Sequence, residues 1–422
     1  MKNTRTLFTI LSAVVSLSAI ADDMPALYPF QPYNRDFIRT HVQAITEDPQ
    51  ALENIFEMSR RGLDRATPQE QPWAGSFWPL IQGQIANRYQ DKTIFRPNEL
   101  FSWEENVSDY RRNSARDHVR INDLTERELL HLSPAEKYDV LLGDNSFDLT
   151  NRIWGYVENY GSSKMWNYLT RPLEIPEGFR LPNPNDNISL WEGICHGWAL
   201  AAGGIARPEN TVEFMLPNGK KLAFLPTDIK ALISLMYANS DVQNDVLMEG
   251  WRCNKKNPKK DRFGRFYDET NGSKSNQQVE PPCADVHPAI WHMSVVNLTG
   301  VQRRAFVVEL DANSVVNNHP FAGYEMSYFN PATGDYGRLD RSVLALAQYR
   351  QDPFKAARHP LTHSIVGVEM RMKYTNWTNP REGRTDSASK DSMKNKTMLY
   401  DLELDAQGNI VGGQWRVTIV AE

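Results

Sequence analysis

The sequence predicts an α+β protein, because the spacing of its apolar residues changes along the chain. Before about residue 250 they recur mostly at helical intervals, whereas after about residue 290 apolar and polar residues alternate, as they do in strands. The chain has 422 residues, of which 41% are hydrophobic and 23% charged. These values are typical of a globular protein and argue against a disordered or fibrous chain, and no stretch after the first residues approaches the roughly 18 unbroken apolar residues of a membrane span. At roughly 100 to 200 residues per domain, we expect two or three structural units.

Residues 1–21 are typical of a secretory signal peptide. Lys2 and Arg5 form a short basic start, residues 7–15 are mostly apolar, and Ala19-Ile20-Ala21 matches the small-x-small cleavage pattern. We therefore expect cleavage before Asp22 and a location in the periplasm or outside the cell. Loss of Lys2 and Arg5 changes the formal net charge from −5 to −7. Neither this balance nor any long basic block indicates a nucleic-acid partner.

Residues 22–170 are expected to form a mainly helical N-terminal region, which could serve as a pro-region. Helical spacing between residues 33 and 64 predicts two consecutive helices on either side of Asp48-Pro49. Ser133, Pro134 and Glu136 predict a helix start, because the serine can cap exposed amides and the glutamate can complete a capping box. A further helix is expected over residues 157–169.

Residues 171–350 are expected to form the core of the protein, and residues 351–422 a C-terminal β segment packed on it. A connector comes first, since residues 171–187 contain four prolines. Helical spacing then predicts helices over residues 193–206 and 228–250, the second opened by Thr227. Alternation predicts strands over residues 291–298, 304–310, 324–329, 364–374, 397–404 and 410–417, with a turn at residues 405–409.

Cys195 is the strongest candidate for a reactive residue. It follows Trp191-Glu192-Gly193-Ile194 and precedes a run of small residues that can pack as a buried helix, so the thiol is expected at a helix N-terminus. The helix dipole and the backbone amides at such a position lower a thiol pKa and stabilise an oxyanion, which are the two requirements of an acyl-transferring cysteine. The structural alternative is a small buried apolar residue.

A nucleophilic cysteine also needs a base that a third group orients. His292 is expected to open a strand, and Asp311 follows the next expected strand. A hairpin of this length would place His292 and Asp311 side by side at one sheet edge, with the Cys195 helix packed on that sheet. We therefore expect a catalytic core with Cys195 as nucleophile, His292 as general base and acid, and Asp311 orienting the imidazole.

Other residues compete for these roles. His287 is the alternative base, in a position more typical of a loop because a proline follows it. His196 projects roughly 100° away from Cys195 on the expected helix, so we expect it to pack rather than to react. Asp311 could instead cap a turn, which leaves Asn330 as the alternative third member.

The pattern Trp-x-Gly-x-Cys-His-Gly-Trp-Ala at residues 191–199 resembles the active-site segment of the transglutaminase elicitor family, known from oomycete plant pathogens and marine bacteria. Residues 72–79 resemble the family's N-terminal tryptophan motif. Residues 318–324 are similar to the segment that oomycete members present as the plant-recognised elicitor. Residues 402–405 and 412–415 resemble its C-terminal strand pair, so the resemblance extends over roughly residues 70 to 415.

This resemblance implies an aminoacyltransferase, a protein-glutamine gamma-glutamyltransferase, on an α+β fold similar to papain-like cysteine peptidases. The Cys195 thiolate would attack a glutamine carboxamide, ammonia would leave with a proton from His292, and a lysine or polyamine would resolve the thioester. The substrates would be proteins or peptides with accessible glutamine and lysine. Trp191, Trp198 and Trp291 are candidates for aromatic walls around the oxyanion that exclude water, with core packing as the alternative.

The resemblance also implies that calcium could be a cofactor, although the residues themselves require none. Asp261, Asp268 and Glu269 could ligate the ion, but their spacing matches no EF-hand loop.

The cysteine count is three. Cys253 and Cys283 flank a polar segment of 29 residues, and a disulfide closing it would stabilise the fold by roughly 3 to 4 kcal/mol. We expect this bridge, which leaves Cys195 as the reactive thiol.

Two other functions fit the same residues. A cysteine peptidase or amidase would use the same triad, with the helical N-terminal region as an inhibitory pro-region. A non-catalytic, elicitor-like host-recognition protein would keep the fold and display a surface loop such as residues 318–324.

Overall fold

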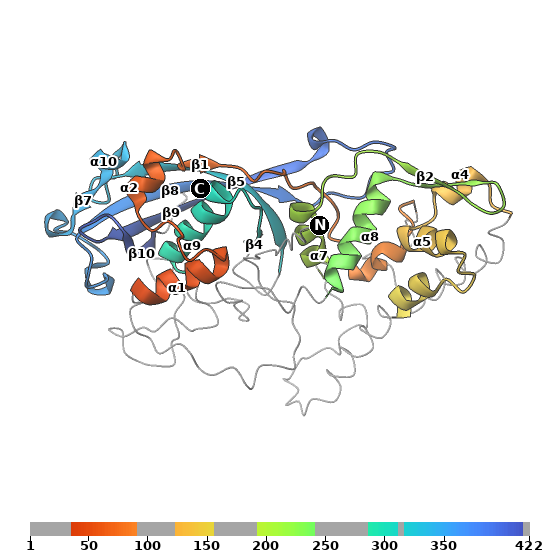
Figure 1. Ribbon diagram of the computed structural model, residues 1–422, viewed down its shortest axis with the longest axis horizontal. Helices are drawn as coiled ribbons and strands as arrows, with labels where there is room; N and C mark the ends of the chain where they lie inside the picture. Colours follow the sequence, from red (N-terminus) through yellow and green to blue (C-terminus); the bar gives the residue numbers. More distant parts are fainter. Residues whose placement is uncertain (1–34, 91–122, 156–191, 241–285, 311–315, 417–422) are drawn as a thin grey trace, which may run out of the picture. The chain divides into compact units, whose positions relative to one another are not determined.

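The computed structural model describes residues 35–90, 123–155, 192–240, 286–310 and 316–416 (Figure 1). They form two compact units, each built from segments far apart in the sequence. The sheet unit contains residues 35–72, 286–310, 316–376 and 393–416, and the helical unit contains residues 73–90, 123–155, 192–240 and 377–392. These units cut across the boundaries predicted at residues 170 and 350. No helix within the described stretches is both long and apolar enough to cross a lipid bilayer.

The sheet unit is organised around one sheet, which has eight strands within the described residues. They are β1 (Arg65–Ala66), β4 (Val307–Glu309), β5 (Asn318–Phe329), β6 (Tyr336–Gly337), β7 (Leu344–Ala345), β8 (Ser364–Asn376), β9 (Ser392–Leu404) and β10 (Ile410–Arg416). The principal order is β1-β5-β8-β9-β10, with β4 and β6 paired to β5 and β7 paired to β8. β5 and β8 form a long antiparallel pair, as do β9 and β10.

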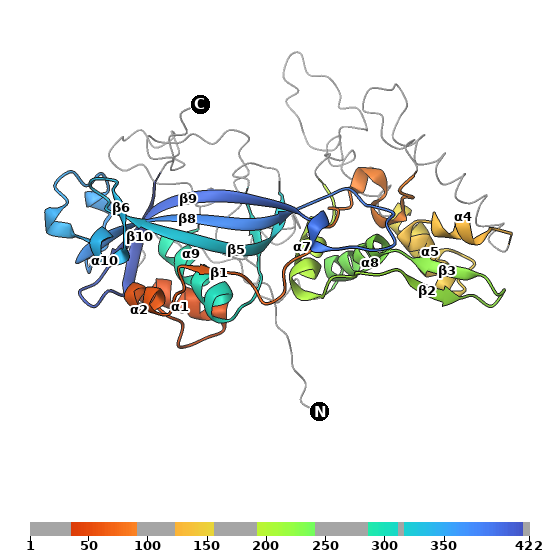
Figure 2. The ribbon, with the colours of Figure 1, turned by 90° about the horizontal axis from the view of Figure 1, so that it is seen from above.

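Helices α1 (Arg35–Thr46), α2 (Ile55–Arg60) and α9 (Pro288–Val295) lie on one face of this sheet (Figure 2). α9 continues as a π-helix over Val296–Val301, and the short α10 spans Leu339–Ser342. The core takes residues at helical spacing from α1 and alternate residues from the strands: Ile38, Val42, Ile45, Val366, Val368, Met370, Met372, Tyr400, Leu402 and Leu404. The two apolar periods in the sequence therefore correspond to the buried faces of these elements.

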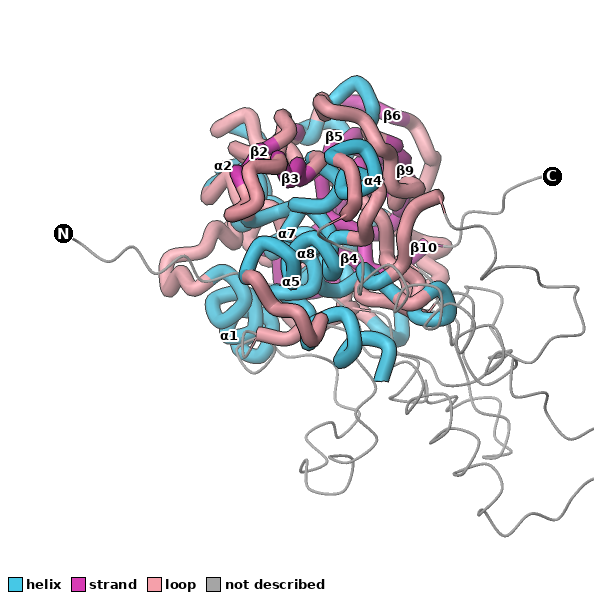
Figure 3. Tube along the Cα trace, turned by 90° about the vertical axis from the view of Figure 1, so that its right-hand side faces the viewer, coloured by secondary structure: helices cyan, strands magenta, loops and turns pink. Residues whose placement is uncertain are grey.

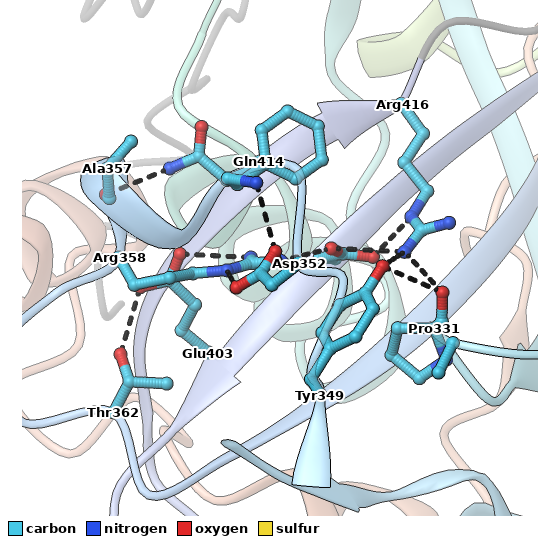
Figure 4. A network of polar contacts seen from close by, with 12 residues as sticks. Pro331, Tyr349, Asp352, Ala357, Arg358, Thr362, Glu403, Gln414 and Arg416 are labelled. Atoms are coloured by element: carbon cyan, nitrogen blue, oxygen red, sulfur yellow. Dashed lines mark hydrogen bonds and ion pairs between the residues drawn. The ribbon is translucent and has the colours of Figure 1, made fainter. Parts of the chain in front are cut away.

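The opposite side of β9 carries a buried ionic layer. Asp401 and Glu403 alternate with the core residues of that strand. Arg358 donates from Nη2 to Asp401 at 2.7 Å. It also donates from Nη1 to Glu403 at 3.2 Å (Figure 4). The same guanidinium holds Asp352 through two hydrogen bonds of 2.9 and 3.0 Å. Burial by itself lowers the pKa of Arg358, but these carboxylates raise it above its ordinary value. The layer therefore joins β9 to the loop before β8 through a guanidinium that remains charged.

The helical unit contains α4 (Glu126–Leu130), α5 (Pro134–Leu142), α7 (Cys195–Gly204), α8 (Pro226–Ala238) and the hairpin of β2 (Val212–Met215) and β3 (Lys221–Phe224). α5 and α7 both pack against α8 (Figure 3). A buried ion pair places Lys137 Nζ of α5 2.5 Å from Asp228 Oδ2 of α8. Asp228 also accepts a hydrogen bond from the backbone of Leu225, the residue before α8, so the same carboxylate fixes where α8 begins.

Shorter elements complete the described chain. Residues 148–155 are helical, and 3₁₀ turns occur at Leu80–Gln82, Gln84–Ala86, Leu346–Gln348, Lys355–Ala357 and Ala388–Lys390.

Several predicted elements are confirmed. α1 and α2 lie on either side of Asp48-Pro49. α5 begins after Ser133, whose Oγ accepts from Glu136 N at 3.2 Å while the Glu136 carboxylate accepts from Ser133 N at 2.8 Å, which is a complete capping box. β8, β9 and β10 correspond to the last three predicted strands. α8 begins at Pro226 rather than after Thr227, and the helix expected over residues 157–169 lies outside the described residues.

The strand predicted over residues 291–298 is wrong, because these residues belong to α9 and the π-helix that follows it. All eight residues of α9 are buried, so the sequence shows no polar stripe that would separate a helix from a strand. Its start was nevertheless indicated by Pro288 at the first helical position, with His287 as the N-cap. His292 therefore lies on a helix, and no hairpin of the expected kind starts there.

The surface loop that the host-recognition alternative would display at residues 318–324 is not formed, because these residues belong to β5. β5 begins at Asn318 rather than at Tyr324, and every residue from Asn318 to Tyr324 is buried. Pro320 obscured this strand, since proline is disfavoured inside strands. In the structure Asn318 to Pro320 pair with β4, which is shorter than the strand predicted over residues 304–310, and the rest of β5 pairs with β8. The elicitor-like segment is thus an interior strand and not a displayed loop.

Candidate active site

Cys195 is the first residue of α7, which starts two residues after the predicted start at residue 193, so the thiol lies at a helix N-terminus as expected. Ile194 is the N-cap, and the first hydrogen bond of the helix runs from Trp198 N to Ile194 O at 3.0 Å. The side chain is a buried thiol with 9% of the residue exposed. The thiol therefore lies at the positive end of the helix dipole, where negative charge on sulfur is stabilised.

The tryptophan motif at residues 72–79 supports this helix start. Ile194 N donates to Phe77 O at 2.8 Å, Pro79 forms an isolated antiparallel bridge with Gly193, and Leu80 N donates to Glu192 O at 2.8 Å. A side chain at Gly193 would collide with the Phe77 carbonyl, so this close approach requires glycine. A segment more than 100 residues upstream thus holds the backbone immediately before Cys195.

The small residues after Cys195 allow α7 to pack tightly on α8. A Cβ at Gly197 would collide with Ser234 O and lie 2.7 Å from Ala238 Cβ. The ring of His196 hydrogen-bonds to the Ala238 backbone, although burial still lowers its pKa below the ordinary value. His196 is therefore a neutral group held against α8, which agrees with the packing role expected for it.

Trp198 lies in the core of the helical unit. It is fully buried, and its Nε1 donates to Trp73 O at 3.3 Å. A side chain at Gly75 would meet the Trp198 indole at 2.8 Å, so the tryptophan motif closes over this ring. These contacts assign Trp198 to core packing. Trp191, the neighbouring candidate, lies outside the described residues.

His292 is buried on α9 in the sheet unit. Its Nδ1 lies 2.9 Å from the hydroxyl of Tyr400 on β9, and both residues are fully buried. Within the described part of the chain its Nε2 has no hydrogen-bond partner. Burial lowers the pKa of His292 to about 3, so the imidazole is neutral, and burial raises the pKa of Tyr400 well above its ordinary value. The site therefore holds a neutral imidazole beside a protonated phenol.

Trp291, the residue before His292, faces the core of the sheet unit. Its ring packs edge-on against Phe306 and Phe321, with centroids 6.3 and 6.4 Å away. It is 3% exposed, and its role in the described structure is core packing.

The two alternative residues have structural partners of their own. His287 caps α9, since its Nδ1 accepts from Ala289 N at 3.3 Å, and burial, with a smaller contribution from His359, lowers its pKa to about 3. Asn330 follows β5, where its side-chain oxygen accepts from the backbone of Ala332 at 2.9 Å and holds a turn. The contact of Asn330 is the ordinary use of asparagine in a turn.

The predicted triad is not fully described by the structure. Cys195 belongs to the helical unit and His292 to the sheet unit, and Asp311 lies outside the described residues, so their association stays a prediction. Other expectations also fall outside the described residues: the signal peptide, the Cys253 and Cys283 bridge, and the calcium candidates Asp261, Asp268 and Glu269.

Tyr400, the hydrogen-bond partner of His292, was not among the residues that the sequence indicated. It lies 108 positions after His292 and in the sequence is one apolar member of an alternating strand. No spacing rule connects a residue of a strand to a distant histidine, so only the packing of α9 on the sheet reveals this contact.

Acidification is expected to destabilise the protein through His292. Its pKa of about 3 in the fold lies below the value of about 6.5 for an unfolded chain. The stabilisation is therefore complete above about pH 6.5 and is lost as the pH falls from about 6.5 toward 3. Urea titrations of the wild type and His292→Gln should show the wild type losing about 2 kcal/mol more between pH 7 and pH 5. If the free energy of unfolding fell equally in the two proteins, His292 would not be the group whose low pKa makes the fold sensitive to acid.

Comparisons with known proteins place the fold and the family. No curated protein sequence matches the chain. The crystal structure of the GP42 transglutaminase from Phytophthora sojae matches 90% of this chain and 86% of that chain, with a TM-score of 0.50 and 17% identity. This similarity in fold confirms the predicted α+β class. A family model described as transglutaminase elicitor matches residues 185–420, more than half of the sequence. The chain therefore belongs to the transglutaminase elicitor family.

Proposed function

We propose that the protein is an exported transglutaminase, which transfers the acyl group of a glutamine side chain to a primary amine through a thioester on Cys195. The observation that carries this proposal is the position of the thiol. Cys195 is the first residue of a buried helix, within the region that matches the transglutaminase elicitor family. Such a position favours both a thiolate and the oxyanion that forms when it attacks a carbonyl.

In the proposed reaction, His292 takes the thiol proton as Cys195 Sγ attacks the carboxamide carbon. The carbon–nitrogen bond then breaks, and His292 returns the proton to the departing ammonia. An amine attacks the thioester, and its proton passes through His292 to the sulfur as the carbon–sulfur bond breaks. Asp311 is kept as the proposed third member, although the described partner of Nδ1 is the Tyr400 hydroxyl and not a carboxylate.

The hydrogen bond between His292 and Tyr400 fits the proposed role of His292 as a general base. A tyrosine hydroxyl can accept a hydrogen bond as well as donate one. When Tyr400 accepts from Nδ1–H, the lone pair of the imidazole lies on Nε2, which has no hydrogen-bond partner among the described residues. Burial keeps the imidazole neutral before reaction, and the negative charge of a nearby thiolate would stabilise the imidazolium during it.

The test is amine incorporation by the protein. The mature chain is incubated with a glutamine-donor protein and a labelled primary amine, with and without calcium, and both ammonia release and the label are measured. We expect one ammonia for each amine incorporated, and a thioester trapped on Cys195 by mass spectrometry. Peptide cleavage without incorporation would instead indicate a cysteine peptidase, and neither reaction would indicate a binding protein.

Tyr400→Phe is expected to weaken catalysis without removing it. The change deletes one hydroxyl and leaves Nδ1 of a fully buried histidine without its partner, which costs about 1 to 3 kcal/mol. We expect kcat/KM to fall by roughly 10- to 100-fold and the pH profile to shift, since the imidazole loses its orienting contact. Tyr336→Phe, at a position that is 58% exposed, is the matched control and should leave both unchanged. If Tyr400→Phe and Tyr336→Phe had the same kcat/KM and the same pH profile, Tyr400 would not position His292.

Three further parts of the proposal rest on residues outside the described part of the chain. Export rests on the signal-like residues 1–21, a structural disulfide on Cys253 and Cys283, and calcium binding on the acidic residues between 261 and 269. No step of the proposed reaction passes through calcium.

A further inference from the structure

We infer that a pocket in the helical unit binds an uncharged, flat side chain of the glutamine donor, next to the reactive glutamine. This inference rests on the proposed function. The pocket has a volume of about 200 Å³, and its aromatic walls are Phe77, Trp78, Tyr89 and Trp377. A cavity of roughly 150 Å³ admits a benzene-sized group, so this one has room for a single aromatic or amide side chain.

The pocket is built on the backbone that positions the nucleophile. Phe77, Trp78 and Pro79 line it, and the carbonyl of Phe77 accepts from Ile194 N at 2.8 Å. Pro79 pairs with Gly193 in an antiparallel bridge. α7 and its first residue, Cys195, follow directly. Backbone hydrogen bonds within the helical unit therefore connect the wall of the pocket to the start of the helix that carries the thiol.

The lining of the pocket is uncharged. None of the described residues that line it carries a formal charge at neutral pH, and its polar groups include the amides of Gln82, Gln84 and Asn379. The Tyr89 hydroxyl donates to Asp228 at 2.9 Å, and burial raises the pKa of Tyr89 well above its ordinary value. Its phenol is therefore both occupied and neutral.

The uncharged lining favours a side chain of the glutamine-containing substrate over the charged amine substrate. A lysine or polyamine ammonium would lose its hydration in the pocket without gaining a carboxylate, and an acidic side chain would find no cation. An aromatic ring could pack against Trp78 and Trp377, and a carboxamide could hydrogen-bond to the amides. The occupant is thus a neutral residue of the glutamine-containing peptide.

The backbone around the pocket is held in a strained conformation. Trp78 has a φ of 48° and Gln84 a φ of 50°, values that are uncommon for any residue but glycine and a genuine outlier for one as bulky as tryptophan. Such conformations persist where packing over-determines them. Here the Phe77 ring packs edge-on against Trp377 at 5.1 Å, and Trp78 is 2% exposed. The pocket is therefore formed before a ligand binds, which lowers the cost of binding.

The test uses binding, so that it does not depend on activity. Fluorescent peptides with one glutamine and a neighbouring Phe, Asp or Lys, placed before or after it, are titrated against full-length Cys195→Ala protein. We expect the peptide with Phe on one side to bind at least about tenfold more tightly than its charged counterparts. Trp377→Ala should abolish this preference, and Phe214→Ala, an aromatic residue outside the pocket with the same 40% exposure, should retain it.

A second variant provides a gain of specificity. Asn379→Asp places a carboxylate in the lining and should raise the affinity of the peptide with Lys while lowering that of the peptide with Asp. Equal binding of all peptides, or a preference that neither pocket variant changes, would overturn the inference. Amine incorporation by wild type with the same peptides separates the two proposals. If the pocket variants change the binding preference but wild type incorporates no amine, the pocket is supported and the transferase is rejected. If wild type incorporates amine but the variants leave the binding preference unchanged, the transferase is supported and the pocket is rejected.

Discussion

Cys195→Ala is expected to fold normally and to lose amine incorporation by at least about 10³-fold, because the proposed thioester forms on the Cys195 sulfur. The change is small in structural terms. α7 is rich in alanine and glycine, and alanine is the best helix former. Circular dichroism and a urea titration check the fold, and label incorporation checks the activity. Incorporation that survives in this variant would remove the proposed mechanism.

The pairing of Cys195 with His292 has its own readout. A thiol whose proton is taken by a neutral imidazole as the sulfur attacks is alkylated well below pH 8, whereas an ordinary thiol must first ionise, with a pKa of about 8.5. The rate of alkylation of Cys195 by iodoacetamide, located by mass spectrometry, should therefore remain high at pH 6 to 7 in the wild type and shift to about pH 8.5 in His292→Gln. His292→Gln should also lower kcat/KM by about 10² to 10⁴-fold. Identical alkylation profiles would show that the two residues do not act together.

Arg358→Met is expected to destabilise the protein by about 3 to 5 kcal/mol, the range for removing one partner of a buried ion pair. Arg358 is 3% exposed, and its partners Asp352, Asp401 and Glu403 are 1%, 0% and 1% exposed. Methionine preserves much of the volume but leaves three buried carboxylates. Among the described residues the cation that remains beside them is Arg416, which pairs with Asp401. The loss is therefore the cost of uncompensated buried charge rather than of a cavity.

Urea titration of Arg358→Met beside Arg371→Met measures this effect. Arg371 lies on β8 with its side chain exposed, and its replacement should change stability by less than about 0.5 kcal/mol. A similar small change for Arg358→Met would mean that the ionic layer contributes no more than surface ion pairs do.

Local signals in the sequence predicted much of the fold. Ser133 and Glu136 predicted the start of α5 because a capping box involves only neighbouring residues. The start of α7 at Cys195 and the strands β8 to β10 followed from equally local patterns of small and alternating residues. The same reasoning failed for α9, since a helix buried on all sides has no polar face, and for β5, where Pro320 lies within a strand.

The sequence by itself therefore determined the fold class, the family and the position of the thiol at a helix start, because caps, periodicities and motifs depend on residues close together in the chain. The tertiary structure decided the environment of His292 against Tyr400, the burial of residues 318–324 in β5, and the uncharged pocket beside Gly193 and Ile194. Each of these depends on segments more than 50 residues apart, which only the packing of the core brings into contact.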